Sequence, residues 1–150
     1  MVLAVLLPAM VPAQAAEPYA ADAQACDAAG SAEACARAGD FLWHHNGTKN
    51  LARCLESGEE LCVRPAETRV TAIRRIDRAA YKFHDKACAG DNAESCNRAG
   101  VFHAVQYGGA GDEDTAAREA RDAELRFAKA CKLGSQEGCR NVGSTRPLKR

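Results

Sequence analysis

Apolar residues recur at helical spacing in two long stretches of the chain. The first stretch steps alternately by three and four residues through Ile73, Ile76, Ala80, Phe83 and Ala87. The second steps in the same way through Ala116, Ala120, Ala123, Phe127 and Ala130. Residues at this spacing share one face of an α-helix, so each stretch predicts an amphipathic helix that packs through that face.

Glycine signals indicate where two further helices end. These helices are expected at Ala32 to about His45 and at Asn92 to about Tyr107, and they stop at Asn-Gly and Gly-Gly. Aromatic residues make up only 5% of the 150 residues, while alanine is abundant. This composition favours closely packed helices over a β-sandwich. The expected fold class is all-α.

The N-terminal segment has the pattern of an export signal. A run of about ten apolar residues precedes Ala13-Gln14-Ala15, which has the small-x-small form of a cleavage site. We expect residues 1–16 to be a signal peptide, because the run is too short to span a membrane and two prolines oppose a buried helix. The protein is therefore expected to be periplasmic or secreted, without stable membrane insertion.

The cysteines are even in number and regularly spaced. All eight follow the signal segment: Cys26, Cys35, Cys54, Cys62, Cys88, Cys96, Cys131 and Cys139. Successive pairs enclose eight residues in the first case and seven in the others, and glycine lies near the middle of each segment. These glycines, Gly30, Gly58, Gly90 and Gly134, can end one helix in a left-handed conformation, and a following serine or asparagine can cap the next. Each pair therefore predicts a structural disulfide that staples a helical hairpin in an oxidising compartment.

Residues around the cysteines also recur. Lys86-Ala87-Cys88 matches Lys129-Ala130-Cys131 before the turn, and a Cys-x-x-x-Gly segment follows it at Cys35–Gly39, Cys96–Gly100 and Cys139–Gly143. These second cysteines are separated by 61 and 43 residues. Self-similarity at a period of about 20 to 50 residues is typical of solenoids. The chain thus predicts hairpins around 26–35, 88–96 and 131–139, each made of a helix, a stapled turn, a helix and a glycine-rich link.

The Lys-Ala-Cys motif, the seven-residue spacing and the link Val105-Gln106-Tyr107-Gly108-Gly109-Ala110-Gly111 together resemble the cysteine-rich Sel-1-like repeat, in the Hcp type of exported proteins. The resemblance implies a short right-handed solenoid of stapled hairpins, similar to tetratricopeptide repeats, over residues 17–145. It also implies a scaffold that binds a protein or peptide. Some members of this type are associated with weak penicillin binding or β-lactam hydrolysis, which is the alternative function.

One segment departs from the pattern. The link after Gly47 lacks the second glycine and continues into the pair Cys54 and Cys62, with Pro65 close behind. Residues 46–66 are either a stapled insertion or a shrunken repeat, and we favour the insertion because Pro65 leaves little room for a second helix. Residues 146–150 are expected to be a disordered tail.

Candidate contact residues lie near the ends of the second helices. They are Trp43, His44, His103, Gln106 and Tyr107. Each has a competing interpretation as a packing residue between repeats, and for Trp43, the only tryptophan, a buried anchor is the stronger one. His84 aligns with Phe127, four residues before a cysteine, which suggests a partly buried helical position. The sequence leaves the oligomeric state open.

Residue types needed for catalysis are not arranged in a known motif. None of the serines begins a Ser-x-x-Lys sequence, which a serine β-lactamase would need. The four histidines do not form a metal-binding pattern, so no metal and no cofactor is expected. Twenty basic residues balance twenty acidic ones, which disfavours a nucleic-acid partner. An enzyme is therefore less expected than a binding protein.

Overall fold

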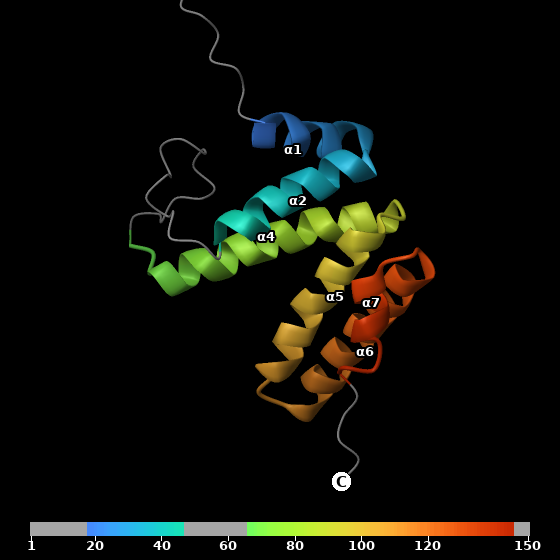
Figure 1. The fold of residues 1–150 in the computed structure, drawn as a ribbon. Coiled ribbons are helices and arrows are strands. Elements are labelled where there is room, and N and C mark those ends of the chain that lie inside the picture. Colours follow the sequence, from blue (N-terminus) through green and yellow to red (C-terminus); the bar gives the residue numbers. More distant parts are fainter. Residues whose placement is uncertain (1–17, 47–65, 146–150) are drawn as a thin grey trace, which may run out of the picture.

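The computed structural model describes residues 18–46 and 66–145, and its regular structure in these two ranges is entirely helical. The helices are α1 (Pro18–Ala29), α2 (Ala32–Asn46), α4 (Arg69–Ala89), α5 (Ala93–Gly108), α6 (Glu113–Lys132) and α7 (Gln136–Asn141). The all-α prediction is confirmed, and α2 and α5 agree closely with the helices expected from the glycine signals (Figure 1). The expected signal peptide, most of the insertion at 46–66 and the C-terminal tail lie outside the described residues.

Each of three helix pairs is closed by a disulfide across its turn. Cys26–Cys35 joins α1 to α2, Cys88–Cys96 joins α4 to α5, and Cys131–Cys139 joins α6 to α7, with Cα atoms 4.4 to 4.7 Å apart. Three of the predicted pairings are therefore confirmed. The fourth, Cys54 with Cys62, lies outside the described residues.

The three turns share one register. A residue with positive φ comes directly before the residue that caps the second helix, in the pairs Gly30-Ser31, Asp91-Asn92 and Gly134-Ser135. Each capping side chain accepts a hydrogen bond from the backbone N–H three residues later, at 2.9 to 3.3 Å. The predicted capping role of these residues is confirmed, and the caps satisfy N–H groups that the helix itself leaves without partners.

The middle turn corrects one expectation. Gly90, expected to be left-handed, has φ −85°, and Asp91 has φ 64° instead. Asp tolerates this region better than most residues with a side chain. Gly90 is needed for a different reason, because a Cβ there would lie 2.6 Å from Cβ of Ala32, the first residue of α2. The turn thus touches the preceding hairpin.

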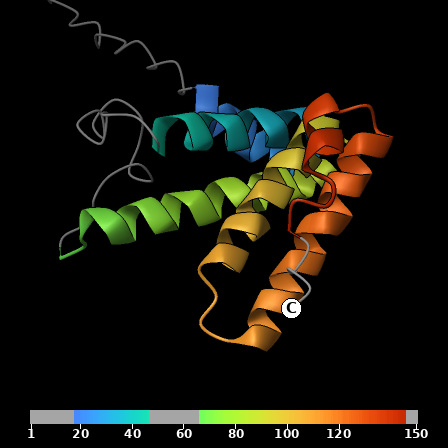
Figure 2. The same cartoon turned by 60° about the horizontal axis from the view of Figure 1, so that its bottom comes forward.

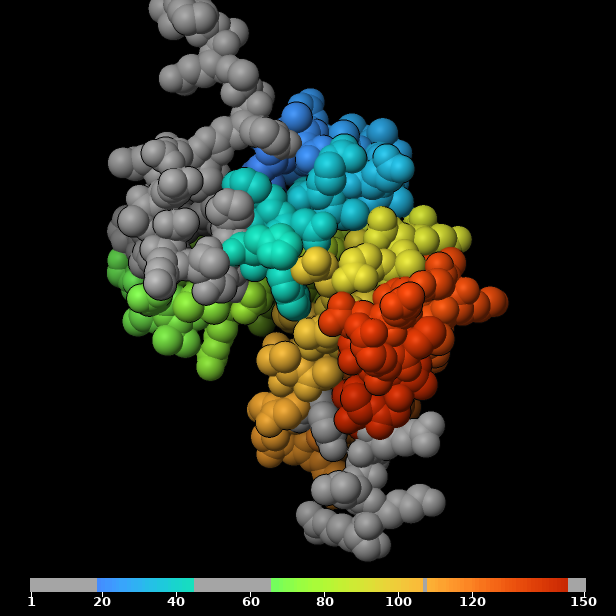
Figure 3. All heavy atoms as spheres, in the orientation of Figure 1, coloured from blue at the N-terminus to red at the C-terminus, as the bar shows by residue number. Residues whose placement is uncertain are grey.

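Helices of neighbouring pairs pack together more extensively than the two helices within a pair. In both ribbon views α2 runs beside α4 and α5 runs beside α6, whereas α4 and α5 diverge from their shared turn (Figures 1 and 2). The main core cluster lies between the first two pairs and consists of Tyr19, Ala38, Leu42, Ile76 and Ala80. In the space-filling view α7 packs beside α5 (Figure 3). Each pair is therefore held mainly by its neighbour.

The alanine of Lys-Ala-Cys packs against the disulfide of the preceding pair. Ala87 forms a buried cluster with Cys26–Cys35, and Ala130 forms one with Cys88–Cys96. Both alanines are fully buried. A larger side chain at this position would push the neighbouring disulfide away, because protein interiors are close-packed. The small residue of the motif is thus explained by a contact between pairs.

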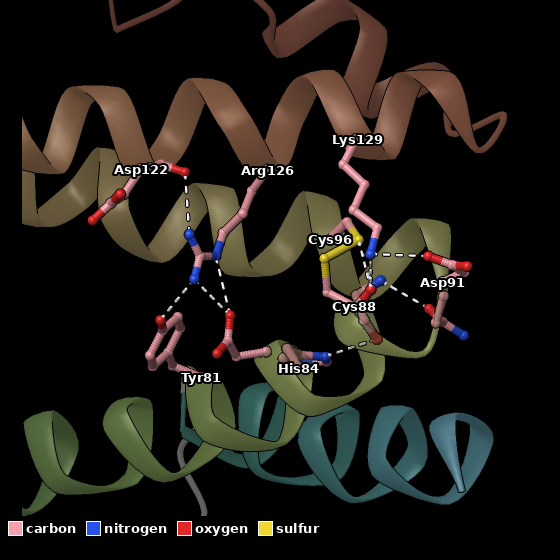
Figure 4. The surroundings of a disulfide bond; sticks show 11 residues. Tyr81, His84, Cys88, Asp91, Cys96, Asp122, Arg126 and Lys129 are labelled. Carbon is pink, nitrogen blue, oxygen red and sulfur yellow. Dashed lines mark hydrogen bonds and ion pairs between the residues drawn. A yellow bond between two sulfur atoms is a disulfide. The ribbon is translucent and has the colours of Figure 1, made fainter. Parts of the chain in front are cut away.

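The lysine of the same motif reaches an aspartate of the preceding pair. Lys86 pairs with Asp27, and Lys129 Nζ lies 2.9 Å from Asp91 Oδ1 and donates to the carbonyl oxygen of Cys88 at 2.6 Å (Figure 4). That carbonyl lies near the C-terminal end of α4, where partial negative charge favours a cation. The motif therefore joins each pair to the one before it through both of its first two residues.

Candidate binding surface

Trp43 lies at the edge of the main core. Its partly buried side chain packs against the core cluster, and its ring meets the His84 ring edge-on with centroids 6.0 Å apart. The guanidinium carbon of Arg98 lies 6.0 Å from the indole centroid, at the outer limit of a cation–π contact. The indole thus joins α2 to α4 and α5, as the anchor interpretation expects.

The other candidates have separate environments. His44 is exposed on α2, and Gln106 is exposed near the end of α5. The Tyr107 side chain lies outside the described atoms. His103, expected to line a contact surface, is only 8% exposed and lies between helices. The structure therefore does not gather the four candidates with described side chains into one patch.

His103 holds three helices together. Its Nδ1 donates to Oε2 of Glu119 on α6 at 2.7 Å, and its Nε2 lies 3.1 Å from the hydroxyl of Tyr81 on α4. The Tyr81 ring also stacks on Phe102, with centroids 4.4 Å apart. With both ring nitrogens engaged inside the protein, His103 acts as a packing residue.

The same tyrosine continues the network to α6. Arg126 donates to the Tyr81 hydroxyl at 3.2 Å and to Asp85 Oδ1 at 2.6 Å (Figure 4). Since the hydroxyl accepts from Arg126, its own proton can go to a neutral His103. Burial raises the pKa of Tyr81, so this phenol stays protonated under physiological conditions. The chain of contacts therefore adds a polar link between α4 and α6.

A second polar group is buried where α2, α4 and α5 meet. His84 Nδ1 lies 3.2 Å from Ser95 Oγ, and His84 Nε2 lies 3.7 Å from Oδ1 of Asp40. Arg98 Nε is 3.0 Å from the same Asp40 oxygen, although the two are not aligned for a hydrogen bond. Burial lowers the pKa of His84 to about 4, and the positive charges of Arg98 and His44 act in the same direction.

This serine, histidine and aspartate group resembles the components of a hydrolytic triad, but its geometry does not suit that chemistry. Ser95 is 2% exposed and His84 is 0% exposed, so the described arrangement gives a substrate carbonyl no access to the hydroxyl. A nucleophile needs to approach the reacting atom at about 3 Å. The group can instead position α2 on α4, with the neutral ring filling the place that Phe127 fills one pair later.

The exposed face of α4 carries a row of cations. Arg74, Arg78 and Lys82 are exposed, follow one another at intervals of four residues, and have no ion pair or hydrogen bond with the described residues. We call these three residues the cationic ridge. The neighbouring cations differ, because Arg75 is held by Glu67 at 3.0 Å and Lys86 by Asp27. Fixed positive charge is thus left available on one face of one helix.

A hollow of about 440 Å³ lies on one side of the ridge, where α4 and α5 diverge. Its lining includes Phe102, Val105 and Gln106 from α5, Arg74 and Arg78 from α4, and one acidic residue, Asp77. Val105 is 66% exposed although it is apolar. We call this feature the α4–α5 hollow. On the other flank the ridge borders a second hollow, of about 410 Å³, whose lining includes Thr71 and Ala79.

Sequence patterns identified only Gln106 among the residues of this surface. The ridge was not recognised because the chain as a whole is neutral, and lysine and arginine at helical spacing are common on solvated faces. A spacing of four residues within the longest helix was the available signal. Its meaning depended on which acidic residues lie nearby in space, and the sequence does not give that.

Other kinds of site are not evident in residues 18–46 and 66–145. The described His, Cys, Asp and Glu side chains form no cluster suited to a metal ion. None of the described helices combines the length and the apolar character needed to cross a bilayer. No protein-family model, curated protein or solved structure matches the chain.

Proposed function

We propose that this chain is an exported scaffold of the Sel-1-like repeat type, which binds a protein or peptide on the surface of its stacked hairpins. The recurrence of the Lys-Ala-Cys contacts carries the proposal. At both junctions between pairs the lysine reaches an aspartate of the preceding pair and the alanine packs on the preceding disulfide. Units that bury surface chiefly against their neighbours are the basis of solenoids, which commonly act as binding surfaces.

The disulfides support the expected location. Three intrachain disulfides are typical of proteins in an oxidising environment, such as the periplasm or the exterior of the cell. Together with the apolar segment at residues 1–16, they favour a protein that is exported before it folds. A partner would therefore be met in the periplasm or outside the cell.

The surface that best suits binding is the cationic ridge with the α4–α5 hollow. Binding sites are usually concave and combine apolar contacts with a few fixed polar groups. The hollow offers Phe102 and Val105 beside Arg74 and Arg78. Trp43 and His103 are used inside the fold, so they support this surface rather than form it.

A site-specific crosslinking experiment tests this proposal. A photoreactive amino acid replaces Val105 in the full chain, exported to an oxidising compartment of its source cells. The matched control replaces Leu125, which is similarly exposed at 68% but lies on α6. A defined adduct with Val105 that is absent with Leu125 supports a binding surface at the hollow. Equal adducts at both positions, or none at either, contradict it.

The alternative of β-lactam hydrolysis has a separate test. The described Ser95 and His84 are buried, so hydrolysis would have to use other residues or a rearranged fold. Turnover of nitrocefin by extensively purified, oxidised protein would support the enzyme. The Ser95→Ala variant then shows whether that serine is involved.

A further inference from the structure

The distance between successive cations of the ridge is close to the distance between alternate side chains of an extended peptide. Residues four apart on a helix are separated by about 6 Å along the axis, so Arg74 to Lys82 covers about 12 Å. In an extended peptide, side chains two residues apart lie on the same side at about 6.6 to 6.8 Å. Three alternate acidic residues of one extended peptide can therefore each face one cation of the ridge.

The residues beside the ridge suit the other side chains of such a peptide. Alternate residues of an extended chain point to opposite sides, so those between the acidic positions are directed away from the first row. When the peptide lies along the boundary between the ridge and the hollow, with its acidic side chains over the ridge, the alternate apolar side chains are directed toward α5, where Phe102 and exposed Val105 lie. The Gln106 amide provides both donors and an acceptor for peptide groups at the rim.

We propose that the ligand of this surface is an extended acidic peptide segment of a partner protein, with acidic and apolar residues in alternation. This inference rests on the proposed binding function and specifies its partner. Charge complementarity selects the acidic segment, because the ridge cations have no acidic partner among the described residues and Asp77 is the one acidic side chain lining the hollow. Such complementarity speeds encounter and selects partners.

A peptide fits better than an anionic membrane or a nucleic acid. The ridge holds three cations on one helix, and the chain as a whole is neutral, with 20 basic and 20 acidic residues. Binding to membranes or nucleic acids generally relies on a broader positive field. The apolar residues of the hollow lie directly beside the cations, so apolar side chains of a bound peptide can pack there.

The test measures binding of a fluorescein-labelled peptide of about nine residues, with alternating glutamate and leucine. Fluorescence anisotropy with the full oxidised chain is compared between the Arg74→Glu, Arg78→Glu double variant and the Arg121→Glu, Arg140→Glu variant. The second variant has the same change in net charge at exposed arginines of α6 and α7. Circular dichroism and non-reducing mass analysis confirm that both variants fold with their disulfides.

We expect the ridge variant to bind the peptide at least about tenfold more weakly than the control variant, as is common for removal of close interfacial charge pairs. The unmodified chain should bind a glutamine–leucine peptide as weakly as the ridge variant binds the acidic peptide. Val105→Asp should also weaken binding. Equal loss in the two charge variants, or tighter binding to dT oligonucleotides or phosphatidylglycerol vesicles than to the peptide, overturns the proposal.

The crosslinking experiment at Val105, repeated in the ridge variant, separates this inference from the proposed function. Loss of the adduct in the ridge variant, but not in the control variant, supports an acidic partner. If the adduct persists in both, the chain binds a partner at the hollow but recognition does not use the ridge, and the inference of an acidic segment is wrong. If no adduct forms in the unmodified chain, the proposed function itself fails.

Discussion

A Cβ atom added at Gly39 would lie 2.8 Å from Cε1 of His84, so the two helices that carry these residues approach as closely as the imidazole allows. The next junction repeats the relationship, because a Cβ at Gly100 would lie 2.6 Å from two atoms of the Phe127 ring. In each case the glycine comes four residues after a second-arm cysteine and the ring four residues before the next first-arm cysteine. Glycine is needed here for space rather than for backbone freedom.

Substitution of either glycine by alanine should therefore destabilise the fold. We expect Gly39→Ala and Gly100→Ala each to lower the free energy of unfolding by about 1 to 3 kcal/mol, because the ring has to move within a packed interior. Gly108→Ala is the control, since a Cβ there meets nothing within 4 Å. Urea unfolding monitored by circular dichroism measures all three. A loss in Gly108→Ala as large as in the other two would show that the close approach is not the cause.

Protonation of His84 should lower stability in acid. Its pKa is about 4 in the folded protein against 6.5 ordinarily, so between these values the unfolded chain binds a proton that the folded chain does not. The contribution of neutral His84 to the free energy of unfolding is full above pH 6.5 and is lost as pH falls toward 4. At pH about 5 the loss should be about 2 kcal/mol. Asp40 and His44 of α2 and Arg98 of α5 are the ionisable groups that face the ring.

The variant His84→Phe isolates this effect, because Phe127 already occupies the equivalent position. Unfolding free energies of both proteins are measured from pH about 7.5 to about 4.5. Other groups titrate alike in the two, so the unmodified chain should lose more stability on acidification than the variant. Parallel curves would mean that His84 is not the titrating group.

The disulfides should differ in their resistance to reduction. Cys26, Cys35 and Cys96 are at most 2% exposed, whereas Cys139 is exposed on α7. Mild phosphine treatment without denaturant, followed by alkylation and peptide mass spectrometry, should label Cys131 and Cys139 before the other two described pairs. Because reduction requires access to sulfur, simultaneous labelling of all three pairs would indicate that the fold opens as a unit.

The lysine contact between pairs should contribute modestly to stability. Lys129→Met removes a hydrogen bond to the Cys88 carbonyl and an ion pair with Asp91, and we expect a loss of about 1 kcal/mol. Lys132→Met is the matched control, because Lys132 is exposed in the same last turn of α6. Thermal unfolding at low and high salt compares them. A larger effect for Lys132→Met would contradict the role assigned to the motif.

Much of the fold followed from short-range patterns. Helical spacing located α4 and α6, and the regular interval between cysteines gave three of the pairings, because both depend on residues close together in the chain. The expectation for Gly90 failed because its role is set by Ala32 of another pair. His103 was placed at a surface because its partners, Tyr81 and Glu119, lie on other helices. The cationic ridge was missed for the same reason.

The position of the left-handed residue within each turn has a consequence for how such hairpins can vary in length. From that residue to the second cysteine the interval is the same in all three turns, but from the first cysteine it is one residue longer in the turn that contains Gly30. The position of the second cysteine is thus fixed relative to the cap of its own helix. The extra residue of the first turn lies between Cys26 and Gly30, and the Gly30 N–H still donates a hydrogen bond to the Cys26 carbonyl. Natural or engineered lengthening of a first arm should leave its crosslink intact, whereas one added residue after the cap would rotate the second sulfur by about 100° away from its partner.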